Sequence, residues 1–414
     1  QDKNEAIQEK NLKEYVRGPI IDRNGETLAS SEEPLGKRTY TKPKAFSSLL
    51  GYWSSIYSTA GLEKTLDSEL SVSECPRKGE KVGSTVQLTI DSGLQTKAYQ
   101  AISDYKGAAV VLNAKTGEIL ALTSSPSFNG NKIEEDWETL NQTEGIFTSN
   151  AFQNSAIPGS VFKLVTSAAI LENGLEDEVV EDKGSLWVDG REIQNSDGSA
   201  YGELTFEEGF VNSSNVYFMT QGLKLGADVL EQTMKKFLIG ETISLDFTDL
   251  KSNLDFGDYS DNMVATTAFG QGNTLITPLH MAMIAQSIAG DGQMMKPYVI
   301  ASVTNGKGET VTEGKKEVLT ETVTKETAQK IKNAMVKAGE KYEMSTLSDG
   351  GQIAAKTGTA QRGDGTNNAW MVSFAPAEDP EYVVCLNHLG TDEYGISLKE
   401  EMEGIYDYLF SSEE

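Results

Sequence analysis

The sequence predicts an α/β (α+β) fold, in which one antiparallel sheet is assembled from distant segments, an all-helical subdomain is inserted, and a small module precedes both. Residues 19–29 read as a hairpin around Asn24-Gly25, the strongest short-range hairpin signal. Residues 152–290 have a mainly helical pattern, and strand patterns lie on both sides of this block. A helical block between strands indicates a sheet that is interrupted by an inserted subdomain.

The length of the chain indicates more than one domain. With 414 residues it exceeds one ordinary core, so about two or three domains are expected. Residues 1–86 are rich in strand and turn patterns and are predicted to form an N-terminal pedestal module. Residues 87–414 are predicted to form the larger domain.

The elements of the larger domain follow from Asp91, which can cap a helix that runs to about Asp104. Two paired strands come next, at 107–112 and 118–123, joined by a turn at 113–117. Helices are predicted at 160–172, 215–225, 228–237 and 278–288. Strand patterns return at 298–304, 351–356, 370–375 and 382–387, and a last helix covers 399–410.

Charge and hydropathy exclude some classes of partner. The chain has 36 basic and 62 acidic residues, a net charge of −26, so it would repel the phosphates of nucleic acids and anionic membranes. No run approaches the roughly 18 consecutive apolar residues of a membrane span. The polar, helical stretch at 1–17 is what we expect of a spacer beyond a missing membrane anchor.

Cysteine and histidine are too few for several kinds of chemistry. Cys75 and Cys385 lie far apart, without partners at metal-ligand spacing, so neither a metal site, another cofactor nor a disulfide is predicted. The two histidines are His280 and His388, and His280 falls in an apolar helical pattern typical of a packed core residue. A mechanism with a histidine base is therefore disfavoured.

Ser-x-x-Lys occurs twice and indicates a nucleophile beside a base. In Ser160-Val161-Phe162-Lys163, Pro158-Gly159 precedes the serine and an apolar helix follows, so Lys163 lies one turn beyond Ser160 on the same face. The second copy, Ser103 to Lys106, lies near the solvated end of the helix that begins after Asp91. We assign the chemistry to the first copy.

Lys-Thr-Gly also occurs twice. The copy at Lys115 to Gly117 falls in the predicted hairpin turn, where these residues serve backbone geometry. The copy at Lys356-Thr357-Gly358 follows an apolar stretch and continues into Thr359, so a sheet strand can present a lysine and two hydroxyls along one edge. We assign the chemistry to the second copy.

Ser-x-Asn has three candidates. Ser213-Ser214-Asn215 lies between two predicted helices, and a loop held by packed helices can present side chains rigidly. Ser260-Asp261-Asn262 ends the acidic stretch 246–261, which reads as a solvated loop, and Ser127-Phe128-Asn129 is weaker. We favour the copy at Ser213, and the one at Ser260 stays open as the alternative.

The three chosen motifs together suit a serine nucleophile that needs no histidine. A serine hydroxyl reacts poorly until a neighbour takes its proton, and burial near a second cation, Lys356, favours a neutral Lys163 that can act as base. Ser213 could relay a proton and Asn215 could hold a substrate amide. Lys356, Thr357 and Thr359 suit a substrate carboxylate, and the N–H groups of Ser160 and Thr359 could form an oxyanion hole.

At these motifs the sequence resembles the penicillin-binding proteins, specifically the monofunctional class B D,D-transpeptidases. The resemblance covers nearly the whole chain and includes the segments at 17–25, 116–122, 158–160, 270–272 and 277–279. The segments at 50–52 and 61–63 are similar to the short, penicillin-binding-protein-A-like members. In two places the sequence departs from the family: Ser149-Asn150-Ala151 stands for Asn-Arg-Ala, and Ala156 for a tyrosine.

The resemblance implies a penicillin-binding, serine β-lactamase-like transpeptidase fold with helices on both faces of the sheet. It implies that the enzyme cross-links peptidoglycan stem peptides ending in D-Ala-D-Ala, forms an acyl-enzyme on Ser160 and is acylated there by β-lactam antibiotics. It further implies an extracytoplasmic domain on a single N-terminal membrane anchor, a membrane glycan polymerase as partner, and a Gram-positive source.

Related functions remain alternatives. A β-lactamase needs a deacylating carboxylate, and the nearest segment, Glu138 to Asn141, has the wrong spacing and precedes the nucleophile. A D,D-carboxypeptidase is a closer rival, since water and an amine attack the same acyl-enzyme. A β-lactam-sensing receptor domain or an idle scaffold would lack turnover of a D-Ala-D-Ala substrate.

Overall fold

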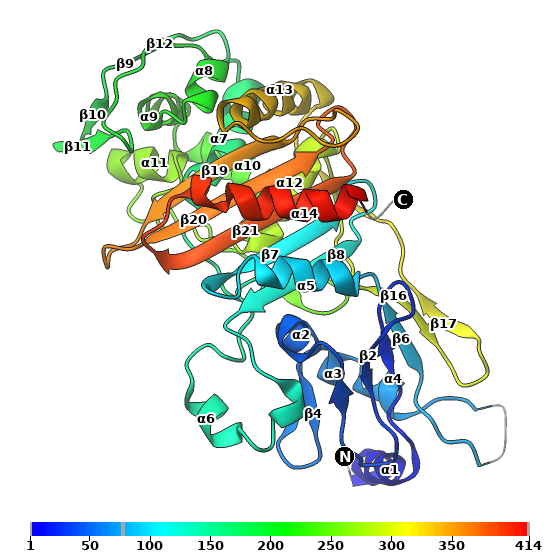
Figure 1. The fold of residues 1–414 in the computed structure, drawn as a ribbon. Helices are drawn as coiled ribbons and strands as arrows, with labels where there is room; N and C mark the ends of the chain where they lie inside the picture. The colour runs from blue at the N-terminus through cyan, green and yellow to red at the C-terminus, as the bar shows by residue number, and fades with distance from the viewer. Residues whose placement is uncertain (1, 76–78, 412–414) are drawn as a thin grey trace.

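The fold is that of a computed structural model, which describes residues 2–75 and 79–411. Its centre is a five-stranded antiparallel sheet in the order β19-β20-β21-β7-β8. The strands are β7 (Lys106–Asn113), β8 (Ile119–Ser125), β19 (Ala354–Gln361), β20 (Asn367–Ala375) and β21 (Tyr382–Thr391). Strands β7 and β21 pair directly, although they lie far apart in the sequence (Figure 1). This confirms the prediction of a sheet assembled from distant segments.

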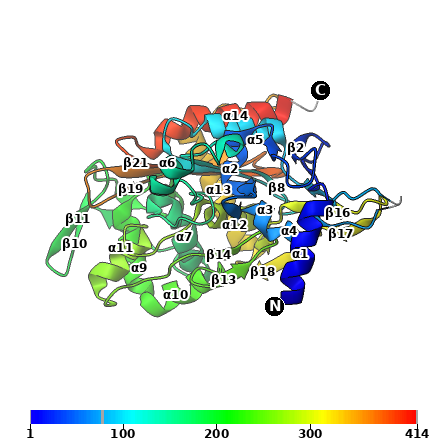
Figure 2. The same cartoon turned by 90° about the horizontal axis from the view of Figure 1, so that it is seen from below.

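Helices cover both faces of this sheet. On one face pack α5 (Ser92–Gln100) and α14 (Lys399–Ser411), which share a buried apolar cluster with the strands. On the other face lie α12 (Pro278–Ala289) and α13 (Lys325–Lys341). Figure 2 shows α5 and α14 on the opposite side of the molecule from the helical subdomain. Asp91 caps α5 by accepting a bond from the Leu94 N–H, and the helix ends at Gln100.

The helical subdomain is built around two helices that pack against each other, α7 (Lys163–Glu172) and α9 (Asn215–Leu225). Its other helices are α8 (Phe206–Val211), α10 (Ala227–Lys236) and α11 (Asp261–Ala268). It also contains three two-stranded sheets that the helical pattern did not predict: β9 (Val180–Asp182) with β12 (Gly202–Leu204), β10 (Ser185–Val188) with β11 (Arg191–Gln194), and β13 (Thr242–Ser244) with β14 (Asp249–Lys251). The β10–β11 hairpin turns at Asp189-Gly190, both with positive φ, the pair that a two-residue turn favours.

The N-terminal part is built on a second sheet, in the order β17-β16-β6-β1-β2-β3. Strands β1 (Ile20–Ile21) and β2 (Thr27–Ser30) form the predicted hairpin, with Gly25 at positive φ in its turn. Around the sheet lie β3 (Thr39–Tyr40), β6 (Thr85–Leu88), α2 (Pro43–Leu50), β4 (Tyr52–Ser54), β5 (Ser58–Ala60), α3 (Leu62–Thr65) and α4 (Asp67–Ser71). Helix α1 (Asp2–Glu14) precedes it, and Gln1, where the predicted helix begins, lies outside the described residues. No helix in the described ranges is long and apolar enough to cross a membrane.

One predicted strand belongs to a different sheet from its neighbours in sequence. The strand pattern at 298–304 forms β16 (Ile300–Thr304), which pairs antiparallel with β6 and with β17 (Thr310–Glu313). It therefore extends the N-terminal sheet and not the central one (Figure 1). Periodicity identifies a strand but carries no information about its partner, because pairing depends on tertiary contacts.

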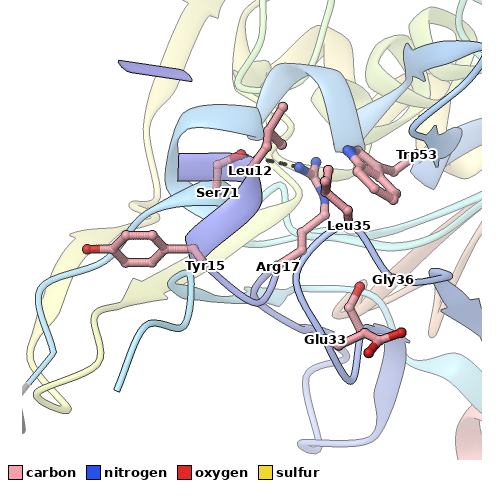
Figure 3. A pocket seen from close by; sticks show the side chains of 9 residues that line it. Leu12, Tyr15, Arg17, Glu33, Leu35, Gly36, Trp53 and Ser71 are labelled. Atoms are coloured by element: carbon pink, nitrogen blue, oxygen red, sulfur yellow. Dashed lines mark hydrogen bonds between the residues drawn. The ribbon is translucent and has the colours of Figure 1, made fainter. Parts of the chain in front are cut away.

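A buried ionic cluster holds the N-terminal module together. The fully buried Glu63 carboxylate accepts bonds from Arg17, Arg38 and the Tyr40 hydroxyl, the last at 2.6 Å. Figure 3 shows the Arg17 guanidinium extended between Ser71 and Trp53, with its bond to Ser71 dashed. The adjoining cavity measures only about 10 Å³, room for about one water molecule. Removing one partner from such a cluster leaves a buried charge, so Arg17 stabilises this module.

Candidate active site

Ser160 lies in a tight turn that leads into α7, between the helical subdomain and the central sheet. It belongs to the 3₁₀ helix η2 (Gly159–Phe162), which continues directly into α7, whereas the sequence predicted a regular helix from Ser160. The turn is pressed against Gly270, where an added Cβ would lie 1.8 Å from the Gly159 carbonyl oxygen. The Gly159 N–H in turn donates to the Gly270 carbonyl at 3.0 Å. Only glycine fits at residue 270.

Strand β19 passes close to this turn. An added Cβ at Gly358 would lie 3.2 Å from the Ser160 nitrogen, so the strand and the turn are in contact there. The Trp370 ring nitrogen, from the next strand, donates to the Ile157 carbonyl at 3.0 Å and ties the turn to the sheet. The structure thus brings together the two segments that carry the predicted oxyanion-hole groups, Ser160 and Thr359.

Lys163, in the first turn of α7, is completely buried and points into the loop before α9. Its Nζ lies 2.9 Å from the Ser213 carbonyl oxygen, 3.0 Å from the Ser213 Oγ and 2.8 Å from the Asn215 Oδ1. The Asn215 side chain is oriented by donating its Nδ2 to the Gln194 carbonyl. Three hydrogen bonds therefore join the Lys163 amine to the loop that carries Ser213 and Asn215.

Lys356, from β19, reaches the same hydroxyl from the other side. Its Nζ lies 3.0 Å from the Ser213 Oγ and donates to the Thr357 carbonyl at 2.9 Å. The Ser213 hydroxyl is thereby placed between two buried amines. An oxygen between two nitrogens can accept a proton from one side while it donates a proton elsewhere, which is the geometry of a relay.

Burial and mutual repulsion change the charges of the two lysines. Burial, followed by the positive charge of Lys356, lowers the pKa of Lys163 well below its ordinary value. Burial also lowers the pKa of Lys356, but the neighbouring Tyr342 opposes that shift. Lys163 is therefore the first of the pair to become neutral as pH rises, and a neutral amine can act as base.

A buried carboxylate holds the Ser213 loop in place. Ser213 has a φ of +52°, a left-handed conformation that is uncommon for a residue other than glycine. The next residue, Ser214, caps α9 by accepting the Tyr217 N–H and donates its hydroxyl to Asp182 at 2.6 Å. Asp182 is 1% exposed and also accepts bonds from Asn195. These contacts hold the loop in one conformation and stabilise Ser213 in its strained backbone geometry.

The remaining predicted residues lie on β19, and some of their side-chain groups already form hydrogen bonds. The Thr357 hydroxyl lies 3.2 Å from that of Tyr342, and the Thr359 hydroxyl accepts the Gly395 N–H at 2.9 Å. Within the described ranges no hydrogen bond joins the Ser160 hydroxyl to the Lys163 amine. Catalytic hydrogen bonds are often long before substrate binds, so the one-turn spacing keeps Lys163 a candidate base.

The competing motif copies lie elsewhere. Ser103 is exposed and bonds to a carbonyl of its own turn, and the copy at 115–117 occupies the β7–β8 turn. The Ser127 hydroxyl lies 2.7 Å from that of Tyr99. Ser260 caps α11, so its hydroxyl accepts the Met263 N–H. The stretch before it, predicted as a solvated loop, includes strand β14.

Four residues that sequence reasoning missed contact the site. Tyr342 bonds to Thr357, and Asp182 anchors the Ser213 loop as described. The rings of Phe210 and Phe218 face the amines of Lys356 and Lys163 at 5.8 and 5.4 Å. No local sequence signal marks these residues, because each reaches the site from another element.

The segment before Ser160, where Asn150 and Ala156 depart from the family pattern, is held by hydrogen bonds. Asn150 is buried and donates two hydrogen bonds. Its backbone N–H donates to the Ser124 Oγ at 2.7 Å, and its Nδ2 donates to the Ser125 carbonyl. Ala156 pairs with Ile276 through two backbone hydrogen bonds of 3.0 Å. Amide and backbone contacts therefore hold the segment before Ser160.

Two families match the chain by sequence. The family described as "Penicillin binding protein transpeptidase domain" matches residues 107–406, and "Penicillin binding protein A dimerisation domain" matches residues 17–86. Among curated relatives, the chain is 28% identical over 420 residues to the peptidoglycan D,D-transpeptidase PbpA of Mycolicibacterium smegmatis, covering 91% of this chain and 84% of the relative. It is 30% identical to penicillin-binding protein 3 of Bacillus subtilis, over 76% of this chain and 51% of the relative.

Solved structures agree with this. The D,D-transpeptidase domain of a peptidoglycan glycosyltransferase from Eggerthella lenta has a TM-score of 0.89 at 28% identity, covering 97% of this chain and 99% of that one. The ceftriaxone acyl-enzyme complex of penicillin-binding protein A from Mycobacterium tuberculosis has a TM-score of 0.89 at 27% identity, with the same coverage. The transpeptidase family matches well over half of the chain, so this protein belongs to the class B penicillin-binding proteins and is an enzyme of the D,D-transpeptidase type.

Proposed function

We propose that this enzyme cross-links peptidoglycan stem peptides ending in D-Ala-D-Ala through an acyl-enzyme on Ser160, and that β-lactams acylate the same residue. The observation that carries the proposal is the Ser213 hydroxyl, placed 3.0 Å from each of two buried lysine amines beside the Ser160 turn. The relatives named as D,D-transpeptidases and the β-lactam acyl-enzymes among the similar structures support it.

In the proposed acylation, neutral Lys163 takes the proton of the Ser160 hydroxyl as its oxygen attacks the carbonyl carbon of the penultimate residue. The negative charge that develops on the carbonyl oxygen is stabilised by the N–H groups of Ser160 and Thr359. When the tetrahedral centre collapses, the amide bond breaks and the proton reaches the departing amine through the Ser213 hydroxyl. Lys163 and Lys356 both contact that hydroxyl, so the proton travels between bonded neighbours.

The rest of the site would hold the substrate. Lys356 supplies positive charge near the terminal carboxylate, for which Thr357 and Thr359 offer hydroxyls and Gly358 allows close approach of the strand. Asn215 would bind the amide of the donor peptide. An amine of a second stem peptide then attacks the ester carbonyl, forms the cross-link and releases Ser160, with the same groups moving the proton in reverse.

The position of Glu138 supports a slow release of β-lactams. Glu138 lies in α6 (Trp137–Gln142), where Trp137 stacks on Tyr57 of the N-terminal module at 4.6 Å. Figure 1 shows α6 beside that module, away from α7 and β19. A carboxylate in this place has no access to an ester on Ser160. We therefore propose long-lived adducts and not β-lactamase turnover.

Mass spectrometry of the chain after penicillin treatment tests the proposal. We expect a stable mass increase on the peptide that contains Ser160, and none after Ser160→Ala. An adduct on the peptide with Ser103, or rapid hydrolysis of the drug, would overturn it.

Turnover separates the transpeptidase from its rivals. With a D-Ala-D-Ala peptide and an added amine acceptor, we expect release of D-Ala together with the cross-linked product. Release of D-Ala to water alone would identify a D,D-carboxypeptidase, and acylation by penicillin without any turnover would identify a sensing domain or a scaffold.

We also propose the wider setting that the family implies. Residues 1–86 would be the pedestal and 87–414 the transpeptidase domain, a division supported by the two family matches at 17–86 and 107–406. The enzyme would act outside the cytoplasm of a Gram-positive cell on a single N-terminal membrane anchor, beside a membrane glycan polymerase. Co-purification of a polymerase with the full-length, membrane-bound protein tests this setting, and recovery of the protein alone from membranes would count against it.

A further inference from the structure

The outer edge of β19 exposes a short row of backbone groups beside Ser160. This strand is the last in its sheet, so every second residue turns its N–H and C=O away from β20. Thr357 and Gln361 are two such residues, because both bond through their outward groups to side chains outside the sheet. Thr359 lies between them with the same orientation. Between Thr357 and Gln361, these three residues are the positions at which a substrate strand could pair with the edge beside Ser160.

The first of these positions is closed from the α13 side. Tyr342 follows α13 directly, and its hydroxyl accepts the Thr357 N–H at 3.4 Å while lying 3.2 Å from the Thr357 hydroxyl. The Thr357 carbonyl accepts the Lys356 amine at 2.9 Å. Both backbone groups of Thr357 are thus occupied.

The third position is closed by a glutamine side chain. Gln271 accepts the Gln361 N–H at 2.7 Å and donates its Nε2 to the Gln361 carbonyl at 3.2 Å. A side-chain amide that makes both bonds replaces the residue of a partner strand. Gln271 follows Gly270, which packs on the Ser160 turn, so this contact starts within the site.

Only the middle position is open. In the described part of the chain no partner is bonded to the N–H or C=O of Thr359, whose hydroxyl is engaged by Gly395. We propose that Tyr342 and Gln271 are specificity-determining residues that restrict substrate pairing along β19 to this one residue. The proposal rests on the acyl-enzyme at Ser160 and names which donor peptides that site accepts.

The direction of pairing defines the substrate class. A peptide antiparallel to β19 makes two hydrogen bonds with Thr359 through one residue, the one whose carbonyl lies at Ser160. Its C-terminal side runs toward Thr357, whose N–H and C=O are occupied by Tyr342 and Lys356, so the second residue beyond the reacting carbonyl finds no backbone partner there. Its N-terminal side runs toward Gln361, where Gln271 prevents further pairing. The site therefore accepts a donor that ends one residue beyond the reacting carbonyl and leaves the strand immediately upstream.

Protection of the edge against aggregation is the competing explanation for these contacts. It predicts that loss of either side chain promotes association of the protein without changing its preference among substrates. The preference of each variant between two donor peptides therefore distinguishes the proposal from protection against aggregation.

The first experiment compares two donors that differ by one residue, an acylated D-Ala-D-Ala and the same peptide extended by a C-terminal glycine. We expect the parental enzyme to prefer the first in kcat/KM by at least about 100-fold. Tyr342→Ala should reduce this ratio about tenfold. Tyr342→Phe, which keeps the ring and loses the hydroxyl, should reduce it less, and Tyr259→Phe on the exposed surface serves as the matched control.

The second experiment varies the N-terminal length of the donor. In the parental enzyme a longer stem peptide should bind no better than a short one, because Gln361 is occupied. Gln271→Ala frees two backbone groups, so KM for the longer donor should fall about tenfold relative to the short one. Gln329→Ala, an exposed glutamine on α13, is the control.

Penicillin acylation of each variant separates this proposal from the function on which it rests. If Ser160 is acylated at the parental rate but both substrate preferences stay unchanged, the two residues only protect the edge and this proposal is wrong. If penicillin does not modify Ser160 even in the parental enzyme, the acyl-enzyme itself is wrong.

Discussion

Two copies of Ser-x-Asn precede helices of the same subdomain, and they differ by one residue in their position relative to the helix start. At 213–215 the middle residue, Ser214, is the N-cap of α9. At 260–262 the first residue, Ser260, is the N-cap of α11. The hydroxyl of Ser260 is therefore used by a backbone N–H, whereas that of Ser213 lies one residue earlier and is available to Lys163 and Lys356.

The capping position decides which of the two hydroxyls remains free to contact the lysines. An N-cap side chain satisfies one of the free N–H groups of the first helical turn, and this holds its oxygen at the backbone. The asparagines differ in the same way: Asn215 faces Lys163, while Asn262 donates to the Val188 carbonyl. The same Ser-x-Asn pattern lies in the proposed active-site loop in one place and begins a helix in the other.

Of the variants that test the role of the Ser213 loop, Lys163→Arg is expected to reduce the rate of acylation most. A guanidinium keeps its proton and cannot act as base, so the rate of β-lactam acylation should fall by about 10³-fold or more. Lys356→Arg retains the charge and should keep more activity. Stopped-flow acylation by a chromogenic β-lactam measures both. Near-parental rates for Lys163→Arg, or loss of acylation in a folded variant of His280 or His388, would show that Lys163 is not the base.

The pH dependence of acylation tests the same pair of lysines. Because the pKa of Lys163 is well below its ordinary value, its neutral fraction and the acylation rate should rise with pH, about tenfold per pH unit, and then level off. The ionisation belongs to the coupled pair of lysines. Lys356→Met removes the repelling charge, which raises the pKa of Lys163 and should move the rise to higher pH. A move to lower pH would contradict this assignment.

Exchange of each serine tests the comparison directly. Ser213→Ala should slow acylation by about 10²-fold, the usual scale for a lost proton transfer. Ser260→Ala should leave the rate near the parental value and lower the free energy of unfolding by about 1 kcal/mol through the lost cap. Acylation kinetics and chemical denaturation of the two variants provide the measurement. If Ser260→Ala is the variant that damages catalysis, the assignment of the two loops must be exchanged.

The smallest effect is expected at Asp182, which contacts Ser214 and Asn195 but not Ser213 itself. Asp182→Asn keeps the size of the side chain but weakens its bonds to Ser214 and Asn195, so we expect acylation to slow about tenfold in a protein that remains folded. Ser214→Ala should have a similar effect, and the double variant should be slowed by less than the product of the two single effects, since the two residues share one contact. Additive effects would mean that Asp182 influences the site by another route.

Much of the site could be predicted from local sequence. Each chosen motif stands at an element boundary that can be recognised locally: Ser160 follows Pro-Gly before an apolar helix, Ser213 precedes α9, and Lys356 follows the apolar start of β19. Their order along the chain indicated one family, and the hairpin at Asn24-Gly25 indicated its N-terminal module. Such signals act over a few residues, through caps, turns and periodicity, which is why they can be read without a structure.

Local sequence was therefore enough to indicate the family of the chain and to select Ser160, Lys163, Ser213 and Lys356 as the proposed reacting residues. The packing of separate elements determines which hydroxyl both lysines contact, which carboxylate holds the Ser213 loop, and that the side chains of Tyr342 and Gln271 occupy the edge of β19. It also decided that β16 pairs with β6 in the N-terminal sheet. The physical reason is the same in each case: these contacts join residues from separate elements, and neither local propensity nor spacing along the chain specifies which surfaces meet when the elements pack.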